Sequence, residues 1–322
     1  MTLDELFSCH MMLSLQVCRL IQEIENKNRI IMTNLKYIFL ALTIIAFWQC
    51  SEDELDSKSI FESDSKIKND FDYWIAENYT NTYNIDLKYR FEDKESNPIY
   101  NLIPADYEKS IALAKITKFL WIESYVELLG EDFMKTYSPR VLFFVGSAAY
   151  NSSSSKVVAT AEGGLKITLY EINALDLNNI NAATLTSSYF HTMHHEFSHI
   201  LHQTKRYPTT FDQISANDYQ ASSWVNVMEQ DALNMGFISP YAGSEAQEDF
   251  AELVAYYFSY DNDYWDERVG RASEEGQAKI NQKIAIIKDY MQVSWGIDMD
   301  AMRTIVQRRA QEVSDLDVTS LN

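Results

Sequence analysis

Cysteine, glycine, proline and positive charge are all scarce in this sequence, and each shortage excludes a class of protein. Only 9 of the 322 residues are Gly and 5 are Pro, while 46% are hydrophobic, which excludes a disordered, collagenous or low-complexity chain. The three cysteines are Cys9, Cys18 and Cys50, so no disulfide framework or cysteine zinc ribbon can form beyond residue 50. The 47 acidic residues outnumber the 27 basic ones and give a formal charge of -20, which disfavours nucleic acid as a partner.

An apolar run near the N-terminus is typical of an export signal. The run Tyr37–Trp48 follows a single basic residue, Lys36, and is shorter than the ~20 residues that a membrane-spanning helix needs. A buried core helix of similar length is the alternative. Residues 1–31 carry acidic residues where a signal peptide begins with basic ones, so we interpret them as a mis-assigned upstream start and Met32 as the true first residue.

Cys50 comes directly after this segment, and the arrangement resembles the signal of bacterial lipoproteins, whose cysteine is lipidated and becomes the mature N-terminus. Residues 47–49 (Phe-Trp-Gln) differ from that signal, which usually has small or aliphatic residues there. The acidic segment Ser51–Glu54 is similar to the surface-export tag of Bacteroidetes lipoproteins. The resemblance implies a signal peptide over residues 32–50, a lipid anchor at Cys50 and an outer-membrane location, exposed at the cell surface.

The rest of the chain is predicted to be a tether followed by one domain. Residues 51–69 are rich in Ser, Asp, Glu and Lys, which predicts a flexible acidic tether, and residues 70–322 form the domain. We expect an α+β fold, with a small mixed sheet in the N-terminal half and a mainly helical C-terminal half beyond Thr186. The predicted helices of the first half are Phe71–Glu77 and Pro104–Gly130. The predicted strands are Ile85–Phe91, Val141–Val145, Val157–Thr160 and, at a sheet edge, Leu165–Tyr170.

Five of the six histidines fall in one short segment, His191–His202, whose spacing predicts a helix with a metal-binding face. The segment contains His-Glu-x-x-His at residues 195–199. On a helix with about 100° per residue, four histidines form a stripe opposite an apolar arc made by Phe190, Met193, Phe197, Ile200 and Leu201. Because residues four apart lie one turn from each other, His195 and His199 can each present a ring nitrogen to one Zn²⁺.

Glu196 lies beside this stripe, where its carboxylate can reach a metal-activated water without binding the metal itself. The alternative is that the motif occurs by chance on the surface of a helix. The other histidines of the segment, His191, His194 and His202, either have surface or structural roles or contact the ligands or the substrate, and the sequence does not decide between these.

A catalytic zinc site needs a third protein ligand besides its open position. The metzincin pattern is excluded, because its glycine position holds His202 and its last histidine position holds Lys205. Residues 245–257 offer carboxylates instead, with Glu248 and Glu252 four residues apart on one predicted helical face. We predict that Glu248 binds the metal and that Glu252 accepts a hydrogen bond from the outer nitrogen of a ligating histidine.

Two other carboxylates of this segment, Glu245 and Asp249, are rivals for the ligand role. A further interpretation needs no metal and makes the segment an acidic, solvated helix face in an acidic protein. Two like charges four residues apart repel each other, however, so a nearby metal ion or cationic imidazole accounts better for the pair.

The two motifs together resemble a known enzyme family. His195-Glu196-Phe197-Ser198-His199 and Glu248-Asp249-Phe250-Ala251-Glu252 look like the motifs of gluzincin metallopeptidases, and the second is similar to that of anthrax lethal factor-type metalloproteases. In that group a tyrosine seven residues before the ligand glutamate assists the transition state, and Tyr241 has this position here. With its lipoprotein start, the chain resembles the zinc-binding metallopeptidase lipoproteins of Bacteroidetes, which implies a zincin-like fold and an association with TonB-dependent outer-membrane importers.

These observations predict a zinc-dependent, peptidase-like hydrolase tethered to the outer membrane. A metal-activated water attacks a peptide bond, Glu196 acts as general base, and Tyr241 donates to the developing oxyanion. The substrate is a protein or peptide, with which the strand Leu165–Tyr170 can pair.

The alternative is a catalytically inactive binding or structural subunit of a nutrient (glycan or peptide) import complex. Glu196 favours the enzyme, because a structural zinc site needs no general base. The aromatic residues that would stack on sugars in the alternative are Trp224, Tyr256, Tyr257, Tyr260, Tyr264 and Trp265.

Overall fold

The computed structural model describes residues 68–150, 156–157, 159–162 and 165–321. The predictions for the signal peptide, for the anchor at Cys50 and for most of the tether therefore lie outside the described residues. Asn69, the last residue of the predicted tether, already belongs to the folded unit, because it caps helix α2 (Asp70–Ile75) through bonds in both directions with Asp72. None of the helices in these described ranges is both long and apolar enough to cross a membrane.

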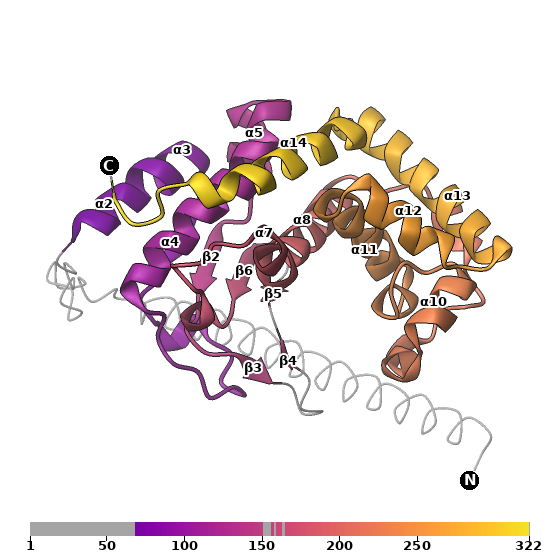
Figure 1. Ribbon diagram of the computed structural model, residues 1–322, viewed down its shortest axis with the longest axis horizontal. Helices are drawn as coiled ribbons and strands as arrows, with labels where there is room; N and C mark the ends of the chain where they lie inside the picture. The colour runs from indigo at the N-terminus through magenta and orange to yellow at the C-terminus, as the bar shows by residue number, and fades with distance from the viewer. Residues whose placement is uncertain (1–67, 151–155, 158, 163–164, 322) are drawn as a thin grey trace, which may run out of the picture. The chain divides into compact units, whose positions relative to one another are not determined.

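Short strands occur only in the first half of the described chain, and helices continue to its end (Figure 1). The helices are α2, α3 (Asn81–Tyr83), α4 (Tyr107–Thr117), α5 (Glu123–Leu129), α6 (Glu131–Tyr137), α7 (Ala182–Leu185), α8 (His191–Thr204), α9 (Thr210–Ile214), α10 (Glu229–Met235), α11 (Ala246–Ser259), α12 (Asn262–Gly270), α13 (Glu274–Tyr290) and α14 (Met299–Glu312). The strands are β1 (Asp86–Lys88), β2 (Val141–Phe144), β3 (Ala149–Tyr150), β4 (Lys156–Val157), β5 (Ala159–Glu162) and β6 (Lys166–Leu169). The expected α+β class and the small mixed sheet are confirmed.

The main sheet has the strand order β1-β2-β6-β5. β1, β2 and β6 run parallel, and β5 pairs antiparallel with β6. The apolar run of β2 is buried on both faces, since Leu142 and Phe144 join the main core while Phe143 joins a smaller second core.

The prediction that Leu165–Tyr170 forms a sheet edge is wrong, because β6 has a partner on each side and β5 occupies that edge. Val157–Thr160 is likewise not one strand: β4 ends at Val157 in a separate pair with β3, and β5 begins at Ala159 in the main sheet. The register and the neighbours of a strand depend on segments that are distant in sequence, and the alternation of apolar and polar residues does not encode them.

The predicted helix over Pro104–Gly130 is confirmed, with an irregular middle. Asp106 caps its start by accepting from the backbone N–H of Lys109, and Gly130 ends it with φ +85°. A π-helical turn, Lys118–Ile122, separates α4 from α5.

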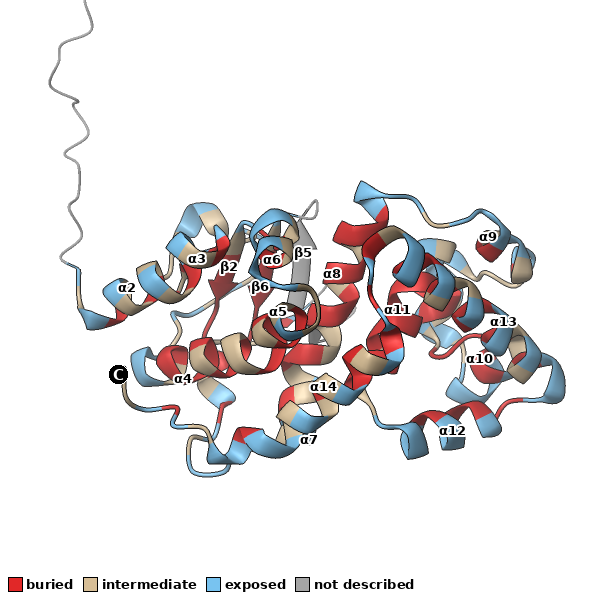
Figure 2. Cartoon of the chain, turned by 90° about the horizontal axis from the view of Figure 1, so that it is seen from above, coloured by how far each residue is buried: buried red, intermediate tan, exposed pale blue. Residues whose placement is uncertain are grey.

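Helices α8 and α11 pack against each other, and α8 also contacts β5 (Figures 1 and 2). Both helices are largely buried in Figure 2. Helix α14 packs on α11 and also on α5 of the N-terminal half. The helix pair that carries the two sequence motifs is therefore enclosed by elements from both halves of the chain.

Candidate metal centre

Helix α8 presents the two faces that the sequence predicts. The apolar arc is buried, with Met193 and Phe197 fully enclosed by the core. A π-helical turn, Thr186–Phe190, precedes α8 and continues the chain without a break from α7. The histidine stripe then faces α11, so the side chains of His195 and His199 meet the carboxylates of that helix.

Three ligand-type atoms converge between the two helices. His195 Nε2 lies 2.9 Å from Glu248 Oε2, His199 Nε2 lies 3.3 Å from the same oxygen, and the two imidazole nitrogens are 3.1 Å apart. Within the described ranges, these residues are the one group of three or more histidine or acidic side chains with ligand atoms close enough to hold a metal ion. The structure thus brings together the three residues predicted as ligands, whose role remains a prediction.

The donor set fits zinc. Two imidazoles and one carboxylate are ligands that Zn²⁺ takes in catalytic sites, and with bonds of 2.0–2.1 Å a tetrahedral ion separates its ligand atoms by about 3.3 Å. The observed separations of 2.9–3.3 Å are close to that value. The lone pairs of two imidazole nitrogens and a carboxylate oxygen repel one another at this distance unless protons or a metal ion lie between them. A metal ion therefore accounts for their convergence.

Glu252 contacts the opposite side of His195. Its Oε1 lies 2.9 Å from His195 Nδ1 and 3.2 Å from His191 Nε2. Its Oε2 accepts a hydrogen bond of 2.5 Å from the Ser239 hydroxyl. A carboxylate at Nδ1 makes that nitrogen the N–H donor and leaves Nε2 free to bind a metal, which is the function predicted for Glu252.

The imidazoles and carboxylates of the site each stabilise the charged form of the other. Burial alone would lower the pKa of His195, but hydrogen bonds to Glu248 and Glu252 raise it to about 10. Burial would raise the pKa values of both glutamates, yet the imidazoles beside them lower both. The site therefore favours positive charge at its centre and ionised carboxylates around it, as a cation-binding site requires.

Glu196 has a different environment from the other acidic residues of the site. Its half-buried carboxylate makes no hydrogen bond or ion pair with any of the described residues. Burial raises its pKa, His195 and His199 lower it, and the carboxylates of Glu248 and Glu252 raise it again, with a net rise. An unpaired carboxylate with a raised pKa is suited to accept a proton.

Tyr241 lies over the centre from the turn before α11. Its ring stacks on the His195 ring at a centroid distance of 5.8 Å, and the Trp224 ring packs edge-on against it at 5.0 Å. Tyr241 is 37% exposed, and burial together with the neighbouring Glu248 carboxylate raises the pKa of its phenol, so the hydroxyl stays protonated beside the ligand atoms. Ser239, which donates to Glu252, also accepts the backbone N–H of Ala242 and so fixes this turn relative to the site.

The remaining histidines of the segment separate into two kinds. His194 is buried and hydrogen-bonds the Tyr125 hydroxyl at 3.0 Å, and burial lowers its pKa to about 3. His191 contacts Glu252, and His202 Nε2 lies 2.8 Å from His199 Nδ1. The stripe of His191 and His202 beside the two ligand candidates was visible in the sequence, but their partners were not.

The rival carboxylates are accounted for elsewhere. Asp249 points away from the centre and forms a buried ion pair with Lys283 at 2.6 Å. Glu245 is exposed at the N-cap of α11. Neither belongs to the cluster of ligand atoms found in the described part of the chain.

Comparisons with known proteins identify the family of the chain. The model of a family described as "Putative zinc-binding metallo-peptidase" matches residues 64–300. A crystal structure of a putative zinc-binding metallo-peptidase from Bacteroides caccae is 43% identical, with a TM-score of 0.71, and the match covers 82% of this chain and 100% of that one. No curated protein matches the chain. The chain therefore belongs to the putative zinc-binding metallo-peptidase family, and its cofactor is the Zn²⁺ expected from the sequence.

Proposed function

We propose that the chain is a zinc-dependent peptidase of the gluzincin kind, with a zincin-like fold and with His195, His199 and Glu248 as ligands. The observation that carries the proposal is the unpaired carboxylate of Glu196 beside three converging ligand atoms. A structural zinc site is closed and needs no such group. A half-buried carboxylate without a partner costs stability, so its presence is best explained by a role in chemistry.

Each residue of the site has its own role in the proposed reaction. The chemistry that zinc supplies when bound to such ligands is Lewis-acid activation of water, whose pKa falls toward about 7. Glu196 accepts the proton of the attacking water and passes it to the leaving amine. The Tyr241 phenol donates a hydrogen bond to the developing oxyanion. Glu252 holds His195 in the tautomer that leaves Nε2 available to the metal.

The alternative, an inactive sugar-binding or structural subunit, has less support. Trp265 and Tyr257 are buried and pack on each other at 5.0 Å. Tyr260 and Tyr264 stack on each other at 4.2 Å, and Tyr256 packs against His191. Trp265 and Tyr257 are therefore unavailable to a sugar, whereas Tyr264 is exposed and Trp224 lies beside Tyr241 at the site.

We also propose that this peptidase is a lipoprotein, anchored at Cys50 and exposed on the outer-membrane surface near a TonB-dependent importer. The support is the apolar run Tyr37–Trp48, the cysteine that follows it and the acidic Ser51–Glu54 segment. A protein or peptide is the substrate that such a position would offer.

The test of the proposed function is the Glu196→Gln variant. We expect the wild-type protein and the variant each to hold about one zinc ion per chain, because Glu196 is not a ligand. Peptide cleavage by the variant should fall by about 10²–10⁴-fold, since the general base is lost. Metal content is measured by elemental analysis, and cleavage by mass spectrometry of a peptide mixture.

Glu245→Gln is the matched control, because it makes the same chemical change at an exposed carboxylate near the site. It should retain full cleavage. A wild-type protein that holds zinc but cleaves no peptide would support the inactive subunit instead, and a fully active Glu196→Gln variant would exclude Glu196 as the base.

A further inference from the structure

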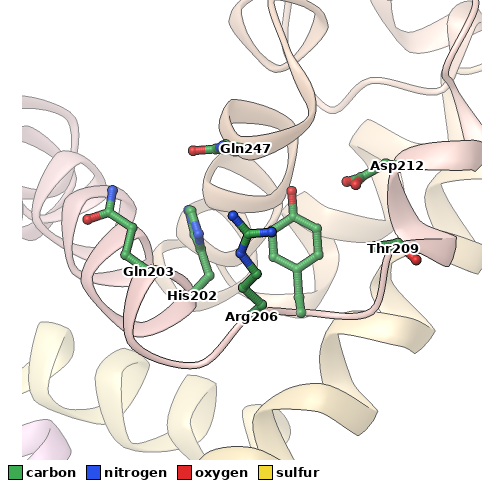
Figure 3. A pocket seen from close by; sticks show the side chains of 7 residues that line it. His202, Gln203, Arg206, Thr209, Asp212 and Gln247 are labelled. Atoms are coloured by element: carbon green, nitrogen blue, oxygen red, sulfur yellow. The ribbon is translucent and has the colours of Figure 1, made fainter.

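A pocket of about 260 Å³ adjoins the candidate metal centre (Figure 3). The end of α8, the segment after it, α9 and the start of α11 form its walls. Its lining residues are His202, Gln203, Arg206, Tyr207, Thr209, Asp212 and Gln247.

Two of these residues connect the pocket to the metal ligands. His202 Nε2 lies 2.8 Å from the outer nitrogen of His199, and Gln247 immediately precedes Glu248. The pocket therefore borders the metal ligands on the outer side of His199, where a peptide that extends past His199 would place one of the groups that flank the scissile bond.

Arg206 is the unusual member of the lining. Among the described residues it has neither a hydrogen bond nor an ion-pair partner, and its side chain is exposed. Every other described arginine has at least one such partner. These paired arginines are Arg90, Arg140, Arg268, Arg271, Arg303, Arg308 and Arg309.

Pairing would have been easy to achieve in this chain, which carries 47 acidic residues against 27 basic ones. Asp212 even lies in the same pocket, yet it forms no ion pair with Arg206. In the view of Figure 3 the Arg206 guanidinium lies between His202 and Asp212. The guanidinium thus faces the pocket with its donors unused.

We propose that Arg206 binds a carboxylate of the peptide substrate, supplied by an acidic side chain near the scissile bond or by the C-terminus. The inference rests on the proposed peptidase function and adds a substrate class to it. A guanidinium presents its donors in a planar fork that matches a carboxylate in two parallel hydrogen bonds. The overall negative charge of the protein repels anionic peptides, so this local cation determines which of them bind productively.

The test measures binding rather than turnover, with the zinc-loaded Glu196→Gln protein so that no peptide is consumed. The probes are labelled pentapeptides that carry one Glu at each position in turn, the matching Gln peptides, and both sets with free or amidated C-termini. We expect loss of the recognised carboxylate to weaken binding by about 10–100-fold in a fluorescence polarisation titration. Adding Arg206→Gln should abolish this difference, and Arg206→Lys should retain part of it.

The two sources of the carboxylate give different results. A side-chain carboxylate makes the Glu-to-Gln change costly and amidation neutral, and a C-terminal carboxylate does the reverse. Arg271→Gln is the control, because it removes the same charge from an arginine that pairs with Glu229 and does not line the pocket. It should leave the difference intact.

Equal binding of all four peptide sets, no binding of any of them, or a difference that survives Arg206→Gln would overturn the proposal. These outcomes are independent of cleavage. Failure of the peptidase function would appear separately, as zinc-loaded wild-type protein that binds these peptides but hydrolyses none.

Discussion

Glu248 and Glu252 lie one turn apart on α11, yet they contact opposite nitrogens of His195. We expect Glu252→Ala to weaken zinc binding by about 10–100-fold, because an orienting partner is lost. Glu248→Ala should weaken it by more than this, because a ligand is lost. Titration of zinc against a chelator of known affinity measures both.

The order of the two effects is what identifies the ligand. Glu245→Ala serves as the control, since this exposed carboxylate contacts neither imidazole, and it should bind zinc as the wild type does. If Glu252→Ala lost more zinc than Glu248→Ala, the two carboxylates would have to exchange roles.

Tyr241 is predicted to act on the transition state alone. Tyr241→Phe keeps the ring that stacks on His195 and removes only the hydroxyl. We expect kcat and kcat/KM to fall together by about 10²–10³-fold, the loss typical of one oxyanion donor, with little change in KM or bound zinc. Steady-state kinetics on any peptide that the wild type cleaves provides the measurement.

The competing explanation for Tyr241 is that it only packs the turn before α11. That explanation predicts wild-type turnover for Tyr241→Phe, because the packing ring remains. Tyr73→Phe, at an exposed tyrosine of α2, controls for loss of a phenol elsewhere and should leave turnover unchanged. An unaltered kcat in Tyr241→Phe would remove Tyr241 from the mechanism.

At the residue scale, the sequence was informative where one helix decides the geometry. The four-residue spacing of His195 and His199, and that of Glu248 and Glu252, predicts which side chains share a face. The contact between His202 and His199 also lies within α8, but two close imidazoles on a helix give no sign of whether they bond to each other. The position of Arg206 depends on the path of the chain after α8, which no spacing encodes.

Helix α11 serves the metal centre with one face and the core with another. Asp249, next to Glu248 in sequence, turns inward and accepts from Lys283 of α13 and from the Tyr219 hydroxyl. Lys283 is fully buried, donates also to the carbonyl of Gly236, and lies over the Phe237 ring at 4.2 Å. This ion pair joins α11 to α13 and contributes to the orientation of the metal-facing carboxylates on α11.

We expect Lys283→Met to destabilise the protein by about 3–5 kcal/mol, because the Asp249 carboxylate would remain buried without its counter-charge. Denaturant unfolding followed by circular dichroism gives the free energy. Zinc affinity should fall as well, since α11 would lose a contact that contributes to its orientation.

Lys279→Met is the control for this substitution, one turn earlier on the same helix. Lys279 pairs with Asp218 and Glu275 near the surface, where such pairs contribute about 0–1 kcal/mol. Equal destabilisation by the two variants would mean that the buried pair has no special role in holding α11.

At the element scale, helices were easier to predict than strands because their signals are local. Asp106 and Gly130 predict the two ends of one helical stretch, and the apolar arc of α8 predicts which side of that helix is buried. The edge position was assigned to Leu165–Tyr170 wrongly, because a strand's neighbours come from distant segments. The π-helical turns, such as Thr186–Phe190, leave no pattern in the sequence that distinguishes them from ordinary helix.

At the scale of the whole described unit, from residue 68 onward, α14 connects the two halves. Arg309 of α14 pairs with Glu123 at 2.9 Å and with Glu127 at 2.9 Å, both on α5. Arg303, on the same helix, donates to the carbonyl of Tyr257 at the end of α11. The helix that bears Glu248 and Glu252 is thus tied to the N-terminal half through α14. Arg309 of α14 is 186 residues from Glu123 in sequence, a pairing that sequence patterning cannot anticipate.

The charge of the whole chain bears on how it would reach a membrane. The full chain carries a formal charge of -20, which opposes adsorption to anionic headgroups, whereas lipid chains contribute about 0.8 kcal/mol per buried CH₂. If Cys50 carries the anchor, the wild type should stay in the membrane fraction through high-salt washes. Cys50→Ser should move to the soluble fraction, because the run Tyr37–Trp48 is too short to hold it alone.

Fractionation of cells that express the wild type, Cys50→Ser and Cys18→Ser, followed by mass determination, tests this prediction. Cys18→Ser is the matched control, because Cys18 precedes the expected start at Met32, and it should behave as the wild type does. Release of the wild type by salt would indicate electrostatic adsorption despite the charge. If the Cys50→Ser protein stays in the membrane with its apolar run uncleaved, the lipid anchor is excluded. The retained apolar segment would then be the membrane anchor, because only this segment could supply the binding energy.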